Sequence, residues 1–290
     1  MSLRASKNTF VCWIAYTCRE SLIMKFTELD YYMQICRSNG NLKPSDWDTP
    51  AYHTAVAPYL LEIEQMEHRI LPFTTTYAEL FETQKAAVTT WEYGKGGITI
   101  PRGFYCPCPT IDCIAVGTSR GRLIKNISSR TKPDYLFGIN NQKQLLVVEM
   151  PDNSGSGIIS REAILHTKSE TLGLRFSEHH NECELIQVIL CEYEDGQIRT
   201  MRCGTMGCDG KTLQELQINE YLYADGGLQE QVITDILRPD FYSFPRVFRR
   251  ALRFLHDSVG NLSAFWTSYD NGVLASAAPH IYSITVKRKI

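Results

Sequence analysis

One stretch constrains the fold of this chain more than any other: PDYLFGINNQKQLLVVEMP, residues 133–151. It reads as two apolar strands joined by a tight turn at its two adjacent asparagines. An acid stands at each open end of this predicted hairpin, Asp134 on the first strand and Glu149 on the second. Because the open ends of a hairpin lie side by side, we expect the two carboxylates to converge at one edge of a sheet.

The segments around the hairpin predict an α/β fold. Helical spacing of apolar residues is present over 52–70, and a second helix is expected over 74–93, with Thr76 and Glu79 placed as a capping box. Strands are expected over 112–116, 121–127, 135–139 and 145–149, a helix over 161–174, and a hairpin over 183–203 turned at its Asp-Gly pair. This order predicts a mixed central sheet flanked by helices.

The rest of the chain is expected to be mainly helical, which suggests three regions. Helices are predicted over 212–222 and 228–237, and a basic amphipathic helix over 243–257. We therefore expect an N-terminal, mostly helical extension (1–70), an α/β core (71–210), and a C-terminal helical region (211–290) that packs on the core.

The acids of the hairpin have the chemistry of a metal site. Mg²⁺ and Mn²⁺ prefer hard oxygen ligands, and Asp134 and Glu149 could supply two of them. An acid that follows an apolar run is costly to bury without a partner, so the alternative is an ion pair. Lys143, Arg161 and Lys168 are the basic residues in this part of the sequence that could provide it.

The Pro-Asp pair, the hairpin and the acid that ends its second strand resemble the PD-(D/E)xK nuclease superfamily. The resemblance covers about 77–202 and implies a restriction-endonuclease-like core. It also implies metal-dependent hydrolysis of phosphodiester bonds in DNA or RNA, with Asp134 and Glu149 holding the ion. An upstream acid often completes such sites, and Glu82 is the preferred candidate here, ahead of Glu79.

The chain departs from the family pattern where a lysine is expected, because Pro151 stands two residues after Glu149. In some members of the family the lysine has moved to the following helix, and Lys168, with His166 beside it, is the matching candidate. The sequence therefore leaves open whether catalysis is retained. The alternative is a non-catalytic protein that binds nucleic acid or another protein on the same core.

Charge and cysteine content bear on partners and compartment. The formal net charge is −2, so any surface for nucleic acid has to be a local patch. Such a patch is predicted on the basic helix, and a short basic run follows near residue 287. The side chains expected to bind phosphate are those of Arg246, Arg249, Arg250 and Arg253. Nucleic acid is the expected partner, with protein as the alternative.

The ten cysteines follow no disulfide framework, which favours a reducing, intracellular compartment. The short apolar segment TFVCWIAYTC leaves secretion as an alternative, and no segment has the length of a membrane span. Thiolates suit zinc, but the spacing within the two cysteine clusters is unlike that of zinc knuckles, so free thiols are the favoured interpretation. These clusters are Cys106, Cys108 and Cys113, and Cys203 and Cys208.

Overall fold

The computed structural model describes residues 49–96, 107, 121–125, 127, 132–153, 158–179, 182–224, 227–238, 246–257, 262–268 and 280–283. The helix predicted over 52–70 is confirmed as α2 (Pro50–Ile70). The helix predicted over 74–93 is confirmed only in part, as α3 (Tyr77–Ala86), because residues 90–93 belong to the strand β1 (Thr90–Lys95). The short 3₁₀ turn η2 (Leu71–Phe73) lies between the two helices. The predicted capping box is absent, because the Thr76 hydroxyl donates to the carbonyl oxygen of Pro72 (3.2 Å) and makes no cap bond.

Within the described residues the strands form one 13-stranded sheet in which every pair is antiparallel. From β3 to β13 each strand pairs with the next along the chain, and β1 lies between β2 and β3. The strands are β1 (Thr90–Lys95), β2 (Arg122–Ile124), β3 (Tyr135–Ile139), β4 (Leu145–Met150), β5 (Ile158–His166), β6 (Glu170–His179), β7 (Glu182–Glu194), β8 (Gln197–Met206), β9 (Leu213–Ala224), β10 (Gly227–Leu237), β11 (Arg246–His256), β12 (Leu262–Ser268) and β13 (His280–Ser283).

This architecture overturns the predicted α/β fold with a mixed sheet flanked by helices. The predicted helix over 161–174 is the β5–β6 hairpin, and those over 212–222, 228–237 and 243–257 are β9, β10 and β11. These strands are buried on both faces over much of their length. In β9, for example, Leu216, Ile218, Asn219 and Tyr221 are all buried. A strand buried on both sides loses the alternation of apolar and polar residues that marks a half-exposed strand, and its apolar spacing then matches a helix.

The hairpin on which the sequence analysis began is confirmed as β3 and β4. Its turn begins at Asn140, whose side-chain oxygen accepts hydrogen bonds from the backbone N–H groups of Gln142 (3.0 Å) and Gln144 (2.9 Å). The Asp-Gly turn between β7 and β8 is also confirmed, with positive φ at Asp195 (51°) and Gly196 (77°).

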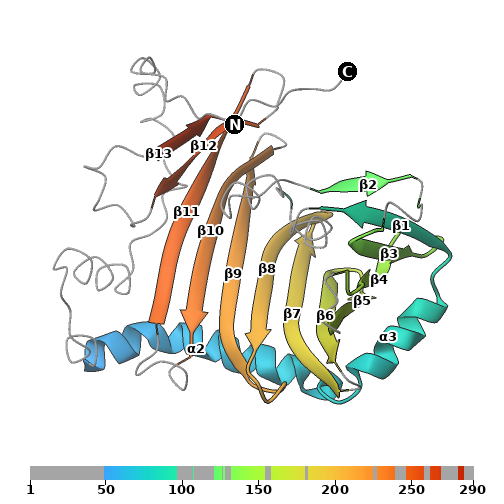
Figure 1. Cartoon of the computed structure of the whole chain (residues 1–290). Coiled ribbons are helices and arrows are strands. Elements are labelled where there is room, and N and C mark those ends of the chain that lie inside the picture. The colour runs from blue at the N-terminus through green and yellow to red at the C-terminus, as the bar shows by residue number, and fades with distance from the viewer. Residues whose placement is uncertain are drawn as a thin grey trace.

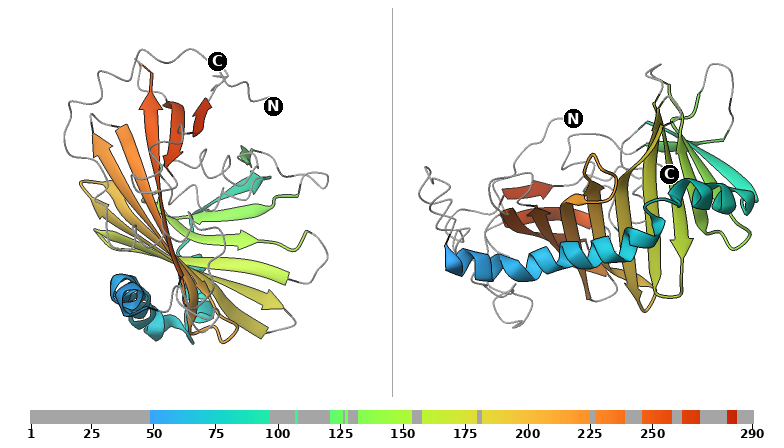
Figure 2. Two further views of the ribbon diagram at one scale, coloured as in Figure 1. Left: turned by 90° about the vertical axis from the view of Figure 1, so that its left-hand side faces the viewer. Right: turned by 90° about the horizontal axis from the view of Figure 1, so that it is seen from below.

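The sheet is strongly curled, and α2 lies across its convex side (Figures 1 and 2). The main apolar core lies between the helices and this side of the sheet. Val56, Ile63 and Met66 of α2 and Phe81 of α3 contribute to it, each with 2% or less of its surface exposed. Leu174 is one of the sheet residues that they cover.

Ion pairs fasten α2 to the same side of the sheet. Arg202 of β8 bridges Glu62 of α2 (3.0 Å) and Glu192 of β7. Glu67 of α2 pairs with Arg238, and at the end of the helix Arg69 pairs with Glu170 of β6. These ion pairs therefore hold the C-terminal half of α2 against the strands.

A second apolar cluster lies on the other side of the sheet, with Phe137, Val148 and Ile164 fully buried. Buried polar groups lie beside it, including Glu162, whose carboxylate accepts a hydrogen bond from Arg175 (3.1 Å). The two clusters explain why few strands show a simple alternation of buried and exposed residues.

No helix within the described ranges combines the length and the apolar character that crossing a bilayer requires. The division at residues 70 and 210 stays a prediction. The sheet itself continues on both sides of residue 210, through the pairing of β8 with β9.

Candidate functional site

Asp134, predicted to bind a metal ion, lies just before β3 and is held by three groups. Its carboxylate accepts hydrogen bonds from the Lys95 ammonium (2.9 Å), the Gly96 backbone N–H (2.7 Å) and the Asn153 amide (3.2 Å). Burial opposes the charged form, but the bonds from Gly96 and Lys95 outweigh it and hold the pKa of Asp134 below its ordinary value.

Glu149, the second predicted ligand, lies on β4 directly opposite Leu136 of β3, so the two acids end neighbouring strands as expected. Its carboxylate pairs with Lys85 of α3 at 2.7 Å. Lys85 is not among the ion-pair partners that the sequence suggested, because α3 approaches β4 only in the folded chain. Each of the two acids therefore has its own lysine.

The other predicted members of the metal site belong to α3, to the β5–β6 turn and to β5. Glu82 is exposed on α3. Lys168 is exposed in the β5–β6 turn rather than on a helix. His166 of β5 is bound by Thr171 (3.2 Å) and by the Leu145 carbonyl (2.7 Å), which gives it a structural role. Among the described residues, no three His, Cys, Asp or Glu side chains are grouped so that they could hold a metal ion.

The predicted basic surface is changed by the strand conformation of β11. A helix would gather the four arginines on one broad side, but successive residues of a strand point to opposite faces. Arg249 and Arg253 are opposite Thr234 and Glu230 of β10, whereas Arg246 and Arg250 occupy the alternate positions. Arg253 also pairs with Glu230 (3.3 Å).

The cysteines of the alternative zinc site fall partly outside the described residues, which do not include Cys106, Cys108 or Cys113. Cys203 of β8 accepts a hydrogen bond from Gln187 (3.2 Å) and packs against the second apolar cluster. Cys208 is an exposed free thiol in the β8–β9 turn.

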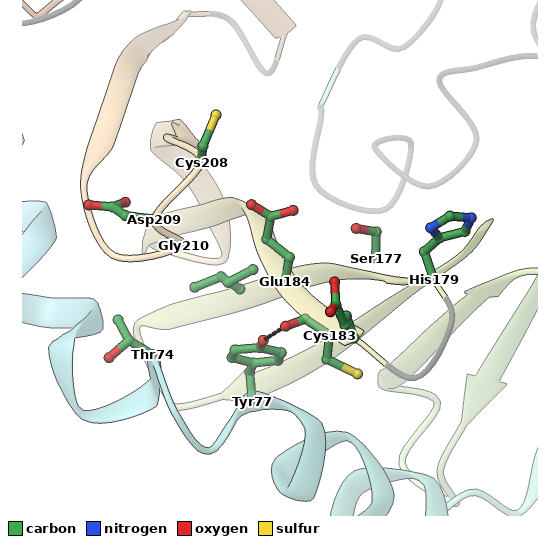
Figure 3. A pocket seen from close by; sticks show the side chains of 11 residues that line it. Thr74, Tyr77, Ser177, His179, Cys183, Glu184, Cys208, Asp209 and Gly210 are labelled. Carbon is green, nitrogen blue, oxygen red and sulfur yellow. Dashed lines mark hydrogen bonds between the residues drawn. The ribbon is translucent and has the colours of Figure 1, made fainter.

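A cleft of about 570 Å³ lies where β6, β7, the β8–β9 turn and the start of α3 meet (Figure 3). Its residues are Thr74, Tyr77, Ser177, His179, Glu182, Cys183, Glu184, Leu185, Cys208, Asp209 and Gly210. Neither the hairpin nor the cysteine pattern predicted this site.

The cleft exists because β7 is longer than its neighbour β8. Pairing of β7 with β6 extends to Glu182, whereas pairing with β8 begins only at Gln187. Next to this overhang, the Tyr77 hydroxyl of α3 donates a hydrogen bond to the Cys183 carbonyl (2.7 Å). Burial, together with the neighbouring Cys183 and Glu184, raises the pKa of Tyr77 above its ordinary value.

The β8–β9 turn forms the opposite wall of the cleft. Gly210 in this turn has φ of 61°, and its backbone lies against that of Leu185. Asp209 fixes the turn by accepting hydrogen bonds from the backbone N–H groups of Lys211 (2.9 Å) and Thr212 (2.8 Å). These bonds, with one from the Thr212 hydroxyl, lower the pKa of Asp209.

The charged lining of the cleft is acidic. Glu182, Glu184 and Asp209 are all exposed, and no Lys or Arg is among those lining residues that the structure describes. Figure 3 shows Glu184 near the centre of the cleft, between the turn that carries Asp209 and the end of β6 that carries His179. Glu182 and Glu184 alternate at the start of a strand, which is the one sequence signal that could have pointed to this surface.

The thiol of Cys183 is a poor nucleophile in this setting. Burial and the nearby Glu178 raise its pKa, although Arg161 opposes the shift, so the reactive thiolate is disfavoured. The arrangement therefore suits recognition of a cation better than covalent chemistry.

No protein-family model and no curated protein matches this chain. Inferences about function therefore depend on the geometry of the cleft and of the predicted acids.

Proposed function

We propose that this chain is a non-catalytic binding protein that takes a lysine- and arginine-rich segment of a protein partner into the acidic cleft. The observation that carries the proposal is the cleft lining, which holds Glu182, Glu184 and Asp209 and, among its described residues, no Lys or Arg. A cleft lined by charges of one sign concentrates the electrostatic field of the protein and attracts ligands of the opposite charge. Its volume of about 570 Å³ lies within the range of protein binding pockets.

The environment of the two hairpin acids supports a non-catalytic protein. A metal ion at Asp134 or Glu149 would have to compete with Lys95 and Lys85, which already neutralise these carboxylates. Hydrolysis of nucleic acid stays a prediction, but the α/β core on which it depended is replaced by an antiparallel sheet. The strand conformation of β11 also removes the amphipathic helix on which the predicted nucleic-acid surface depended.

The proposal is tested by titrating a fluorescent Lys/Arg-rich peptide with the full chain and following its anisotropy. The double variant Glu182→Gln/Glu184→Gln removes two exposed charges without removing side-chain volume. Because exposed ion pairs are each worth about 0.2–1 kcal/mol and two are lost, we expect binding to weaken about twofold to thirtyfold. Raised salt should weaken binding to the wild-type chain as well.

A matched control variant is Glu79→Gln/Glu82→Gln, which makes the same charge change on exposed positions of α3. It should bind the peptide as the wild type does. Equal loss of binding in both variants would mean that the peptide responds to net charge and not to the cleft.

A further inference from the structure

We infer that the basic segment bound by the cleft is supplied by a second copy of this chain, through Lys287, Arg288 and Lys289. This inference rests on the proposed function and names its partner. The segment VKRKI holds the sequence's one run of three consecutive Lys or Arg residues, and three acidic residues line the cleft. The run lies outside the described residues, which resume at β13 and end at Ser283.

The register of the sheet excludes binding of this run to the cleft of its own chain. Residues that pair on neighbouring strands lie at the same height along the strands. One such row of paired residues can be followed from β13 to β9. It is Ile281, Trp266, Arg253, Glu230 and Leu222.

The cleft lies beyond the other end of β9, which begins at Leu213 just after the β8–β9 turn. The nine residues from 213 to 222 (222 − 213 = 9) span about 30 Å along the strand. In Figure 1 β13 lies at the end of the sheet opposite to the turn between β8 and β9.

The linking chain is too short for that path. Lys289 follows Ser283 by six residues (289 − 283 = 6), which reach about 21 Å when fully extended. A run that cannot reach its own cleft can enter the cleft of another molecule. Each chain then offers one cleft and one basic run, so the association is head-to-tail.

The test uses two full-length variants, each of which lacks one half of the contact. Glu182→Gln/Glu184→Gln neutralises two carboxylates of the cleft, and Lys287→Gln/Arg288→Gln/Lys289→Gln neutralises the run. Wild-type chain should associate in sedimentation experiments, more weakly at raised salt, and each variant alone should associate about tenfold more weakly or not at all. Mixed together, the two variants should form a 1:1 dimer that grows no further, because only one intact cleft and one intact run remain.

The outcomes separate this inference from the proposed function. If the wild-type chain stays monomeric at all concentrations while a Lys/Arg-rich peptide binds the cleft, the second-copy inference fails and the proposed function stands. If the variants associate as well as the wild type does, self-association uses another surface and the inference also fails. If the peptide does not bind, the proposed function itself fails.

Discussion

Replacing Phe81 by alanine tests how α3 is attached to the sheet. The Phe81 ring is fully buried and lies edge-on to Phe176 of β6, with ring centroids 5.7 Å apart. Lys85 and Arg161 each place their charge over its face, at 5.6 Å and 5.5 Å from the centroid. The ring is therefore the central contact between α3, β5 and β6.

The expected loss of unfolding free energy follows from the contacts that Phe81→Ala removes. Truncation of a buried phenylalanine to alanine costs about 3–5 kcal/mol of unfolding free energy, which includes the cavity it leaves. The edge-to-face pair with Phe176 and the two cation–π contacts are lost in addition to apolar burial, so we expect a value near the upper end of that range. Phe81→Leu keeps most of the apolar volume and should cost about 1.5 kcal/mol.

The assay is urea unfolding of the full chain, followed by tryptophan fluorescence. The midpoint should fall for Phe81→Ala with little change in the slope of free energy against urea concentration. Glu82→Ala, at the exposed neighbouring position, is the control and should change stability by less than about 0.5 kcal/mol. A loss below about 1 kcal/mol for Phe81→Ala would refute the packing of α3 on β5 and β6.

Three further predictions concern the sheet, the turn and the hairpin acids. A Cβ on Gly204 would meet the Leu213 side chain at 2.5 Å, so Gly204→Ala should cost about 1–3 kcal/mol in the same urea assay, and no loss would contradict the close approach of β8 and β9. The pKa of Asp209 is lowered from 3.8 in the folded chain, so its contribution to stability is present above that pH and is lost as pH falls through the lower folded value. As the pH falls below 3.8, the melting temperature should therefore fall less steeply for Asp209→Asn than for the wild type. Parallel curves of melting temperature against pH would contradict a contribution of Asp209 to stability. The chain should leave mixed DNA and RNA intact with Mg²⁺ or Mn²⁺, whereas cleavage that disappears in Glu149→Ala would support hydrolysis instead of binding.

The parts of the fold that could be predicted from sequence are those fixed by local chemistry. The β3–β4 hairpin follows from two short β-rich runs and an asparagine whose side chain closes the turn at Asn140. The Asp195-Gly196 turn follows from residues that tolerate positive φ. The α2 helix follows from apolar residues at helical spacing, which the fold buries against the sheet.

The remaining elements depend on burial that the sequence does not reveal. In β9, Leu213 and Leu216 face the helices while Tyr221 faces the second cluster, so apolar residues recur on both sides of one strand. Apolar residues at this spacing would also form the apolar side of a helix. Only pairing with the neighbouring strands decides between a helix and a strand. The segment that became β11 was predicted as a helix for the same reason.

The cleft could not be predicted because its walls come from segments that meet only in the folded chain. Glu184 and Asp209 lie on β7 and on the β8–β9 turn, and Tyr77 belongs to α3. What brings them together is the difference in length between β7 and β8, which depends on where each strand stops pairing. Likewise, no sequence pattern pairs Lys85 with Glu149.

The most direct test of the acidic cleft as a binding site is carbodiimide coupling of a lysine-rich peptide to the full chain, with the joined carboxylates located by mass spectrometry. The reagent links a carboxylate to an amine only where the two are in contact. The account predicts coupling at Glu182 and Glu184 above all other acids, and its loss at raised salt. Coupling spread evenly over exposed acids elsewhere, such as Glu79 and Glu194, would contradict it.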